Sequence, residues 1–214
     1  MLTPKQLICF DLNQTLIQEN SWLNLNLAMG MTLEEDQALF SLYQQKKLSY
    51  QDWQRQLAER YIKSGKASKE KILAVVLQYQ YLTGAREIVS YFQQNGFEVI
   101  LISGAMDLLI EHIAQELKIT HWAAANRLHF DKNDYLQEIQ TIAGSEAEIK
   151  LKLLQGICED LHFPLEKCIC IGDGENDLEM FRATGRGITF PGSKLESEAW
   201  QVIGKLSELR IVIG

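Results

Sequence analysis

Four short segments of the 214-residue sequence combine residue types that suit phosphate chemistry. They are, in chain order, Asp11-Leu12-Asn13-Gln14-Thr15, Ser103-Gly104, Lys150 and Gly172-Asp173-Gly174-Glu175-Asn176-Asp177. A carboxylate can attack phosphorus and form an acyl-phosphate, which splits one difficult step into two. Mg²⁺ prefers hard oxygen ligands, while a hydroxyl, an ammonium group and backbone N–H groups can hold phosphoryl oxygens. Together the segments predict a site for a divalent cation and a phosphate group.

Three of these segments follow apolar runs that lack the in–out alternation of a half-buried strand. Those runs are Leu7-Ile8-Cys9-Phe10, Val99-Ile100-Leu101-Ile102 and Cys168-Ile169-Cys170-Ile171, and a fourth lies at Ile188-Thr189-Phe190. Strands that are apolar on both faces are typical of a parallel sheet covered by helices. Ligands bind outside the carboxyl ends of the strands in such sheets. We therefore expect the segments to meet at one edge, with each run ending where its polar residues begin.

Helical patterns alternate with the apolar runs. They cover Ala85–Asn95, Leu108–Leu117 and Glu148–Leu161, the last preceded by a capping box that starts at Ser145. This alternation predicts an α/β fold with a doubly wound, Rossmann-like parallel sheet. The stretch from Arg127 to Gln140 is predicted to be a β-hairpin excursion.

Residues 17–82 break this rhythm, because they contain no convincing strand. A capping box at Thr32 and an N-cap candidate at Ser49 indicate helices instead. We predict a small helical cap domain of residues 17–82, inserted into a catalytic core of residues 1–16 and 83–214. The segment is rich in aromatic residues, which we interpret mainly as the cap's own hydrophobic core, with a ligand box as the alternative: Trp22, Phe40, Tyr43, Tyr50, Trp53, Tyr61, Tyr79 and Tyr81.

Composition and charge narrow the class of protein. Hydrophobic residues make up 46% and charged residues 23%, which excludes a disordered or low-complexity chain. The net charge of −7 argues against nucleic acid or an anionic membrane as the main partner. No apolar run is long enough to span a bilayer, and we expect no secretory signal. The four cysteines are interpreted as buried reduced thiols, with a metal or redox pair as the alternative. These features predict a cytoplasmic protein whose main partner is neither nucleic acid nor an anionic membrane.

The ordered segments resemble the motifs of the haloacid dehalogenase superfamily, in its phosphoserine-phosphatase-like branch. The resemblance runs through nearly the whole chain and implies hydrolysis of a small phosphorylated metabolite, with Mg²⁺ as the cofactor and an aspartyl-phosphate intermediate. It implies that Asp11 is the nucleophile and a metal ligand. The backbone carbonyl of Asn13 would be the second metal ligand and Asp173 the third, with Asp177 supporting the metal site.

The resemblance also implies which residues contact phosphate or substrate. These are Thr15, Ser103, Gly104, Lys150 and Asn176. Lys150 is preferred to Lys152 because its distance in sequence from Asp173 suits the branch. Two residues along a helix also rotate by about 200°, so the two lysines cannot face the same site.

One departure from the family pattern concerns catalysis. The family has Asp at the position of Asn13, where it protonates the leaving oxygen and later activates water; an amide can do neither at neutral pH. General acid–base groups contribute roughly 10²–10⁴-fold, so we predict slow turnover or a stalled acyl-phosphate. Three explanations are open: an engineered inactivating change, a naturally weakened enzyme, and a non-catalytic binder of phosphorylated ligands. A phosphotransferase is a further alternative function.

A second departure concerns the substrate. In phosphoserine enzymes a Glu binds the amine and an Arg binds the carboxylate, and these positions fall on Asn20 and Leu57 here. Glu19 and Arg55 lie nearby in sequence, but each is displaced along its helix or loop. We interpret both as surface or cap–core residues, and we do not expect specificity for phosphoserine.

Overall fold

Seven strands form one sheet in the computed structural model, which describes residues 6–214. Their order is β4-β3-β2-β1-β5-β6-β7, and only β3 and β4 pair antiparallel. The strands are β1 (Leu7–Phe10), β2 (Glu98–Met106), β3 (His121–Phe130), β4 (Leu136–Thr141), β5 (Ile169–Ile171), β6 (Gly187–Thr189) and β7 (Gln201–Val202). The chain order reverses direction across the sheet between β1 and β5, which is where open α/β sheets bind ligands. The predicted doubly wound α/β fold is confirmed.

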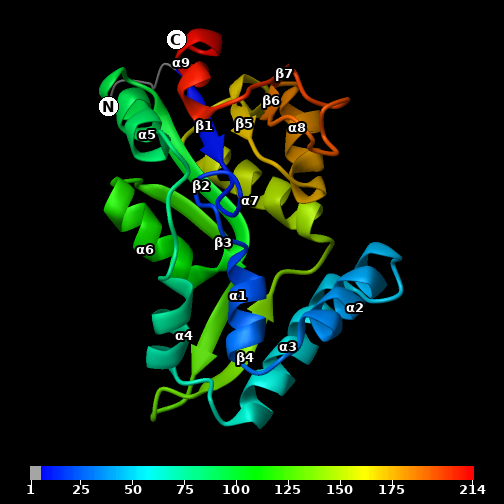
Figure 1. The fold of residues 1–214 in the computed structure, drawn as a ribbon. Helices are drawn as coiled ribbons and strands as arrows, with labels where there is room; N and C mark the ends of the chain where they lie inside the picture. The colour runs from blue at the N-terminus through cyan, green and yellow to red at the C-terminus, as the bar shows by residue number, and fades with distance from the viewer. Residues whose placement is uncertain (1–5) are drawn as a thin grey trace.

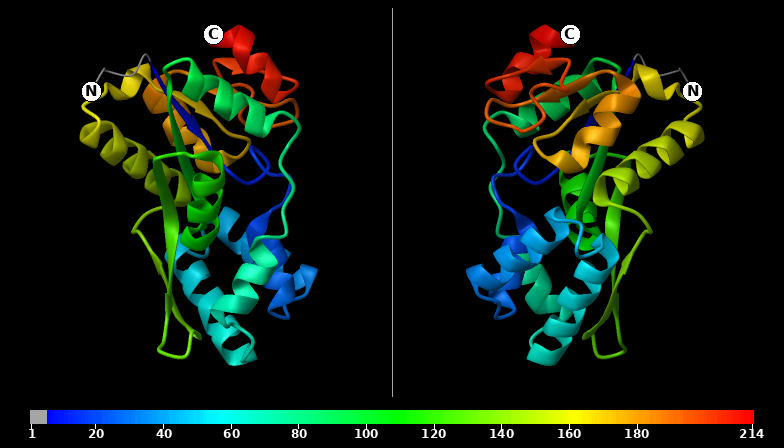
Figure 2. Two further views of the ribbon diagram at one scale, coloured as in Figure 1. Left: turned by 90° about the vertical axis from the view of Figure 1, so that its left-hand side faces the viewer. Right: turned by 90° about the vertical axis from the view of Figure 1, so that its right-hand side faces the viewer.

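Helices cover both faces of this sheet (Figures 1 and 2). They are α5 (Ala85–Gln94), α6 (Asp107–Leu117), α7 (Glu146–Asp160), α8 (Leu178–Thr184) and the short C-terminal α9 (Leu209–Val212). Alternate residues of β1 explain the two layers. Ile8 and Phe10 belong to the apolar cluster that includes α5 and α6, whereas Leu7 and Cys9 belong to the cluster that includes α7 and α8. Both faces are buried, as the unbroken apolar runs predict.

Four more helices lie together past the carboxyl ends of β1 and β5, alongside the hairpin of β3 and β4 (Figure 1). They are α1 (Ser21–Ala28), α2 (Leu33–Gln44), α3 (Tyr50–Ser64) and α4 (Lys69–Val76), here called the four-helix segment. The capping box at Thr32 and the N-cap at Ser49 are confirmed. The chain enters and leaves this segment at adjacent points, where Gln18 N donates to Gln80 O at 2.9 Å. The division into a core and a cap of residues 17–82 stays a prediction.

The second apolar run differs from the expectation. Ser103 and Gly104 do not follow the end of β2 but lie within it, since the strand continues to Met106. The pairing of β2 with β3 shifts register between Ser103 and Met106. Because β2 continues through this irregularity to Met106, Ser103 and Gly104 lie inside the strand and not after its end.

The hairpin is confirmed as β3 and β4, although β3 begins at His121, earlier than predicted. Its first half extends the parallel sheet beside β2, and only its second half belongs to the hairpin. Cys9, Cys158, Cys168 and Cys170 are free and buried, as expected. Within residues 6–214, no helix combines the length and the apolar character needed to cross a membrane.

Candidate active site

Three carboxylates meet at the carboxyl ends of two neighbouring strands. Asp11 follows β1, and Asp173 and Asp177 follow β5, which pairs in parallel with β1. One carboxylate oxygen from each lies within 4.8 Å of the others. Asp11 is 2% exposed and Asp177 is fully buried. The parallel pairing explains the meeting, because it brings two strand ends far apart in sequence to the same edge.

A fully buried lysine compensates part of this negative charge. Lys150, on α7, places its Nζ 2.9 Å from Asp11 Oδ1 and also contacts Asp177 Oδ1. Burial opposes the charged ammonium, but the charges of Asp11 and Asp177 outweigh it, so the pKa of Lys150 lies above its ordinary value. Lys152 is exposed and donates to Ala143 O at 3.3 Å. The structure therefore brings the preferred lysine, and not its neighbour, to the carboxylates.

The carboxylates stay crowded despite this lysine. Burial, followed by the charge of Asp11, raises the pKa of Asp173 to about 6. Burial is also the largest cause that raises the pKa of Asp177, to about 7. Within residues 6–214, Asp11 Oδ1 is buried and receives no hydrogen bond, although it lies beside the Lys150 ammonium. Three carboxylates around a single lysine leave an excess of negative charge, which fits a divalent cation held at Asp11 and Asp173 with Asp177 beside them.

The predicted phosphate-binding residues surround the carboxylates at different depths. Ser103 and Asn176 line the same cavity as Asp11 and Asp173. Thr15 Oγ1 lies behind this surface and donates to Asp173 Oδ1 at 3.3 Å. The carbonyl of Gly104 is turned toward other partners, since it accepts from Trp22 Nε1 at 2.9 Å and from Asn126 Nδ2 at 2.7 Å. All the predicted positions are thus close together, but not all of them face the cavity.

Asn13 lies on the cavity wall with its side chain already engaged. Its Oδ1 accepts a hydrogen bond from the backbone N–H of Ser21 at 3.1 Å. The amide therefore holds the first residue of α1. A carboxylate in this position could accept the same bond and keep a second oxygen for proton transfer, which an amide cannot supply.

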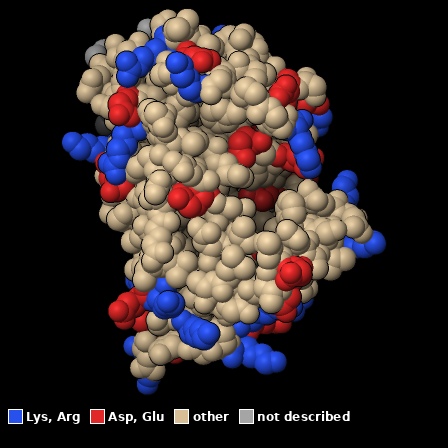
Figure 3. Space-filling view, in the orientation of Figure 1, with Lys and Arg blue, Asp and Glu red and all other residues tan. Residues whose placement is uncertain are grey.

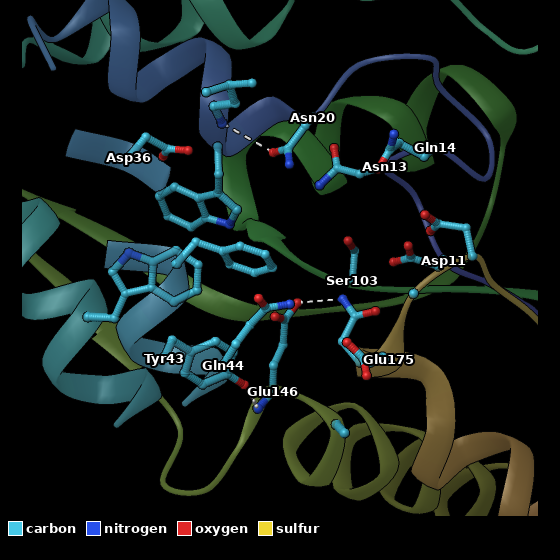
Figure 4. Close-up of a pocket in the computed structure, with 18 residues that line it drawn as sticks. Asp11, Asn13, Gln14, Asn20, Asp36, Tyr43, Gln44, Ser103, Glu146 and Glu175 are labelled. Atoms are coloured by element: carbon cyan, nitrogen blue, oxygen red, sulfur yellow. Dashed lines mark hydrogen bonds between the residues drawn. The ribbon is translucent and has the colours of Figure 1, made fainter. Parts of the chain in front are cut away.

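A cavity of about 340 Å³ separates the sheet edge from the four-helix segment. Figure 3 shows the hollow between the two parts, with acidic side chains inside it. In Figure 4, Asp11 and Ser103 lie on one side, and Asp36 and Tyr43 lie on the other. Eight residues supplied by or next to the four-helix segment line it: Asn20, Trp22, Leu23, Asp36, Phe40, Tyr43, Gln44 and Trp53.

The aromatic residues of this segment divide between two roles. Trp22, Phe40, Tyr43 and Trp53 line the cavity, whereas Tyr61 is fully buried. Trp22 and Trp53 also pack against the main apolar cluster, and Tyr43 and Trp53 pack against the cluster that contains Tyr50. These residues therefore belong to the hydrophobic core and line the cavity at once, and a role in holding a ligand stays a prediction. Their helical spacing could not separate a face turned to the cavity from a face turned inward.

Sequence reasoning missed Glu146. This residue lines the cavity, accepts from Asn176 Nδ2 at 2.7 Å, and lies so close to Gly104 that a β-carbon there would collide with its carboxylate. Burial raises the pKa of Glu146 above its ordinary value. A signal was available, because Glu146 precedes Lys150 by one helical turn and so shares its face of α7.

Glu19 and Arg55, which lie near the substrate-binding positions of phosphoserine enzymes in sequence, do not line this cavity. Arg55 forms exposed ion pairs with Asp52 at 2.8 Å and Glu59 at 3.1 Å. Glu19 Oε2 accepts from Gln80 N at 2.9 Å, and Leu57 is fully buried. The structure thus places Arg55 on the surface and Glu19 at the base of the four-helix segment.

Comparisons with known proteins agree with this geometry. The family model for haloacid dehalogenase-like hydrolases matches residues 8–182. Human phosphoserine phosphatase is 30% identical over 195 residues, which cover 89% of this chain and 84% of that protein. Phosphoserine phosphatase of Methanocaldococcus jannaschii is 24% identical over 100% of this chain and 98% of its own. A solved phospho-aspartyl intermediate analogue of phosphoserine phosphatase superposes with a TM-score of 0.81 at 24% identity, covering 99% of this chain and 100% of the other.

Proposed function

This chain belongs to the haloacid dehalogenase-like hydrolases, in their phosphoserine-phosphatase-like branch, and we propose that it is a Mg²⁺-dependent phosphomonoesterase acting through Asp11. The observation that carries the proposal is the cluster of Asp11, Asp173 and Asp177 around the buried Lys150. Asp11 and Asp173 line a cavity large enough for a small phosphate ester. We place the reaction in the cytoplasm, with a small phosphorylated metabolite as substrate.

Asp11 is the group that attacks. The Lys150 ammonium lies 2.9 Å from its Oδ1. Attack on phosphorus forms an aspartyl-phosphate while the bond from phosphorus to the ester oxygen breaks. Ser103 and Asn176, on the same wall, orient phosphoryl oxygens. The chemistry that Mg²⁺ supplies, when held by Asp11, Asp173 and the backbone carbonyl of Asn13, is the shielding of phosphate charge from the carboxylates.

Asn13 is the weak point of this mechanism. Its amide cannot protonate the leaving oxygen or activate water, so we propose slow turnover or an accumulating acyl-phosphate. The metal position is compatible with Asn13 because the ligand there is a backbone carbonyl. The same residue favours a second candidate function, a pseudo-phosphatase that binds Mg²⁺ and a phosphometabolite without turnover. A phosphotransferase is the third, and it predicts a phosphorylated product in place of free phosphate.

The four-helix segment acts in this proposal as a cap domain, spanning residues 17–82. Hydrogen bonds between its two connections support a hinge, since Gln18 N bonds Gln80 O and Leu82 N bonds Leu16 O at 2.8 Å. Closure over the cavity excludes water from the reacting phosphate. It also restricts substrates to small soluble esters.

The test measures Mg²⁺-dependent phosphate release from a panel of phosphometabolites that includes phosphoserine. The chain and its Asn13→Asp variant are assayed in parallel. An active variant beside a nearly silent parent supports a phosphatase that is disabled at one residue. If neither protein releases phosphate but both bind a panel member with Mg²⁺, the pseudo-phosphatase is the better account.

A further inference from the structure

The cavity wall opposite Asp11 is aromatic and acidic. Phe40 and Trp53 pack with tilted rings whose centroids are 5.8 Å apart, and Tyr43 and Trp53 pack in the same way with centroids 5.1 Å apart. Asp36, in the first turn of α2, lines the same space, and Figure 4 shows it on the side of the cavity away from Asp11. This wall faces whatever group the substrate carries beyond its phosphate.

The charged residues that line the cavity are all acidic. No Lys or Arg is among the lining residues, all of which belong to the described part of the chain. Glu175 is paired with Lys194 at 2.8 Å, but Asp36 has no ion pair within residues 6–214 and accepts only a neutral donor, Asn26 Nδ2, at 2.5 Å. Lys150 is buried behind the phosphate end, between Asp11 and Asp177. The far part of the cavity therefore carries negative charge without a cation of its own.

A substrate carboxylate in this position would meet like charge with nothing to compensate it. An ammonium group would meet both the Asp36 carboxylate, whose partner Asn26 is neutral, and the negative faces of aromatic rings, which attract cations most strongly when water is excluded. A neutral apolar group would fit the rings but would leave Asp36 without a counter-charge.

We propose that the substrate is the phosphate monoester of an amino alcohol, which carries a cationic ammonium group beside its phosphate and has no carboxylate; such compounds are called cationic esters below for this group alone. The ammonium group lies against Phe40 and Trp53 and pairs with Asp36, while the phosphate reaches Asp11. This inference rests on the function proposed above and names the substrate class for the same site. It also predicts that phosphoserine fits poorly, because the guanidinium of Arg55 pairs with Asp52 and Glu59 outside the cavity and so leaves a substrate carboxylate without this partner.

The test compares esters that differ mainly in charge. The Asn13→Asp variant is assayed with Mg²⁺ on phosphoethanolamine, phosphocholine, phosphoserine, phosphoglycolate and p-nitrophenyl phosphate. We expect kcat/KM for the better cationic ester to exceed that for phosphoserine by about tenfold, and that for phosphoglycolate by more. Binding of the same compounds to the parent chain, measured by calorimetry with Mg²⁺, is expected to follow the same order.

Asp36→Asn in the same background isolates the charge, since an amide keeps the size of the side chain and an oxygen for Asn26. The preference for cationic esters over p-nitrophenyl phosphate is expected to fall about fivefold. Glu34→Gln is the matched control: it removes a carboxylate from the same helix, and this exposed residue does not line the cavity. Phe40→Leu is the second variant, and we expect it to lower kcat/KM for phosphocholine more than kcat/KM for phosphoserine.

The outcomes separate the two proposals. Hydrolysis of p-nitrophenyl phosphate with phosphoserine or phosphoglycolate preferred to both cationic esters overturns the substrate class and leaves the phosphatase standing. Silence of Asn13→Asp toward every ester overturns the phosphatase. In that case the calorimetric order still decides the inference: tighter binding of the cationic esters supports it, and equal or tighter binding of phosphoserine overturns it.

Discussion

The two walls of the cavity are built on different principles. The sheet wall takes its carboxylates from the ends of neighbouring parallel strands, so backbone pairing fixes their positions within the fold. The helical wall takes its residues from the faces of α1, α2 and α3, and Phe40 there is 44% exposed. A side chain on a helix face can be replaced without moving the backbone. In the proposed function, the reacting groups therefore lie on the part of the molecule that is hardest to alter, and the groups that select the substrate lie on the part that is easiest to alter.

The walls are nevertheless joined at one carbonyl. Gly104 O accepts from Trp22 on α1, from Tyr50 on α3 at 3.3 Å, and from Asn126 on β3. Two of these three donors belong to the four-helix segment. The segment is thus attached to the backbone next to Ser103, so a change on the helical wall can shift the phosphate end.

The largest expected effect is on the sheet wall. In the Asn13→Asp background, Asp11→Asn removes the nucleophile, and we expect phosphate release to fall about 10⁴-fold or more. In the parent chain with Asn13, where we expect an acyl-phosphate to accumulate, Asp11→Asn should also abolish this covalent species, as detected by intact mass. Continued formation of a covalent phosphoenzyme would show that another residue is the nucleophile.

The next effect tests the missing acid–base group. Asn13→Asp alone should raise phosphate release by about 10²–10⁴-fold, because a carboxyl there can transfer protons. Asn20→Asp is the matched control, since Asn20 also lines the cavity and Asp is an equally good N-cap for α1. An equal gain from both variants would mean that added charge, and not proton transfer at position 13, is responsible.

A smaller effect is expected where the walls join. Trp22→Phe keeps an aromatic ring but removes the hydrogen bond to Gly104 O, and one such bond contributes about 0.5–1.5 kcal/mol. We expect KM to rise about three- to tenfold, measured with the best ester in the Asn13→Asp background. Trp200→Phe, at a tryptophan 42% exposed outside the cavity, should leave KM unchanged.

Mg²⁺ binding should stabilise the protein more at high pH than at low pH. Because the pKa values of Asp173 and Asp177 are raised to about 6 and about 7, ionising them opposes folding, and the metal-free protein should lose stability between about pH 4 and pH 7. A bound cation needs the ionised carboxylates. Mg²⁺ should therefore raise the melting temperature more at pH 8 than at pH 5.5, as thermal unfolding would show, and an equal rise at both values would contradict this assignment.

The smallest expected effect concerns Arg55. Its exposed ion pairs with Asp52 and Glu59 contribute little to stability, and it does not line the cavity. Arg55→Ala should change kcat/KM for every ester by less than about twofold. A selective loss with phosphoserine would show that Arg55 reaches the substrate after all.

Much of the fold could be predicted from local patterns in the sequence. Unbroken apolar runs located β1, β2, β5 and β6, and side-chain caps located the starts of α2, α3 and α7. The early start of β3 was missed because its residues His121 and Trp122 are only partly buried and lack a continuous apolar run. The position of Ser103 inside β2 was missed because a register shift is a property of the strand pair.

The sequence by itself determined the chemical groups of the sheet wall, because strand ends in a parallel sheet converge wherever they occur along the chain. Tertiary structure alone decided which aromatic residues face the cavity, that Glu146 lies against Gly104, and that Asp36 is left without a cation. The physical reason is that the positions of these side chains depend on how each helix is rotated and packed against another part of the chain. Hydrophobic periodicity marks a helix face as apolar but does not say whether a core or a ligand lies in front of it.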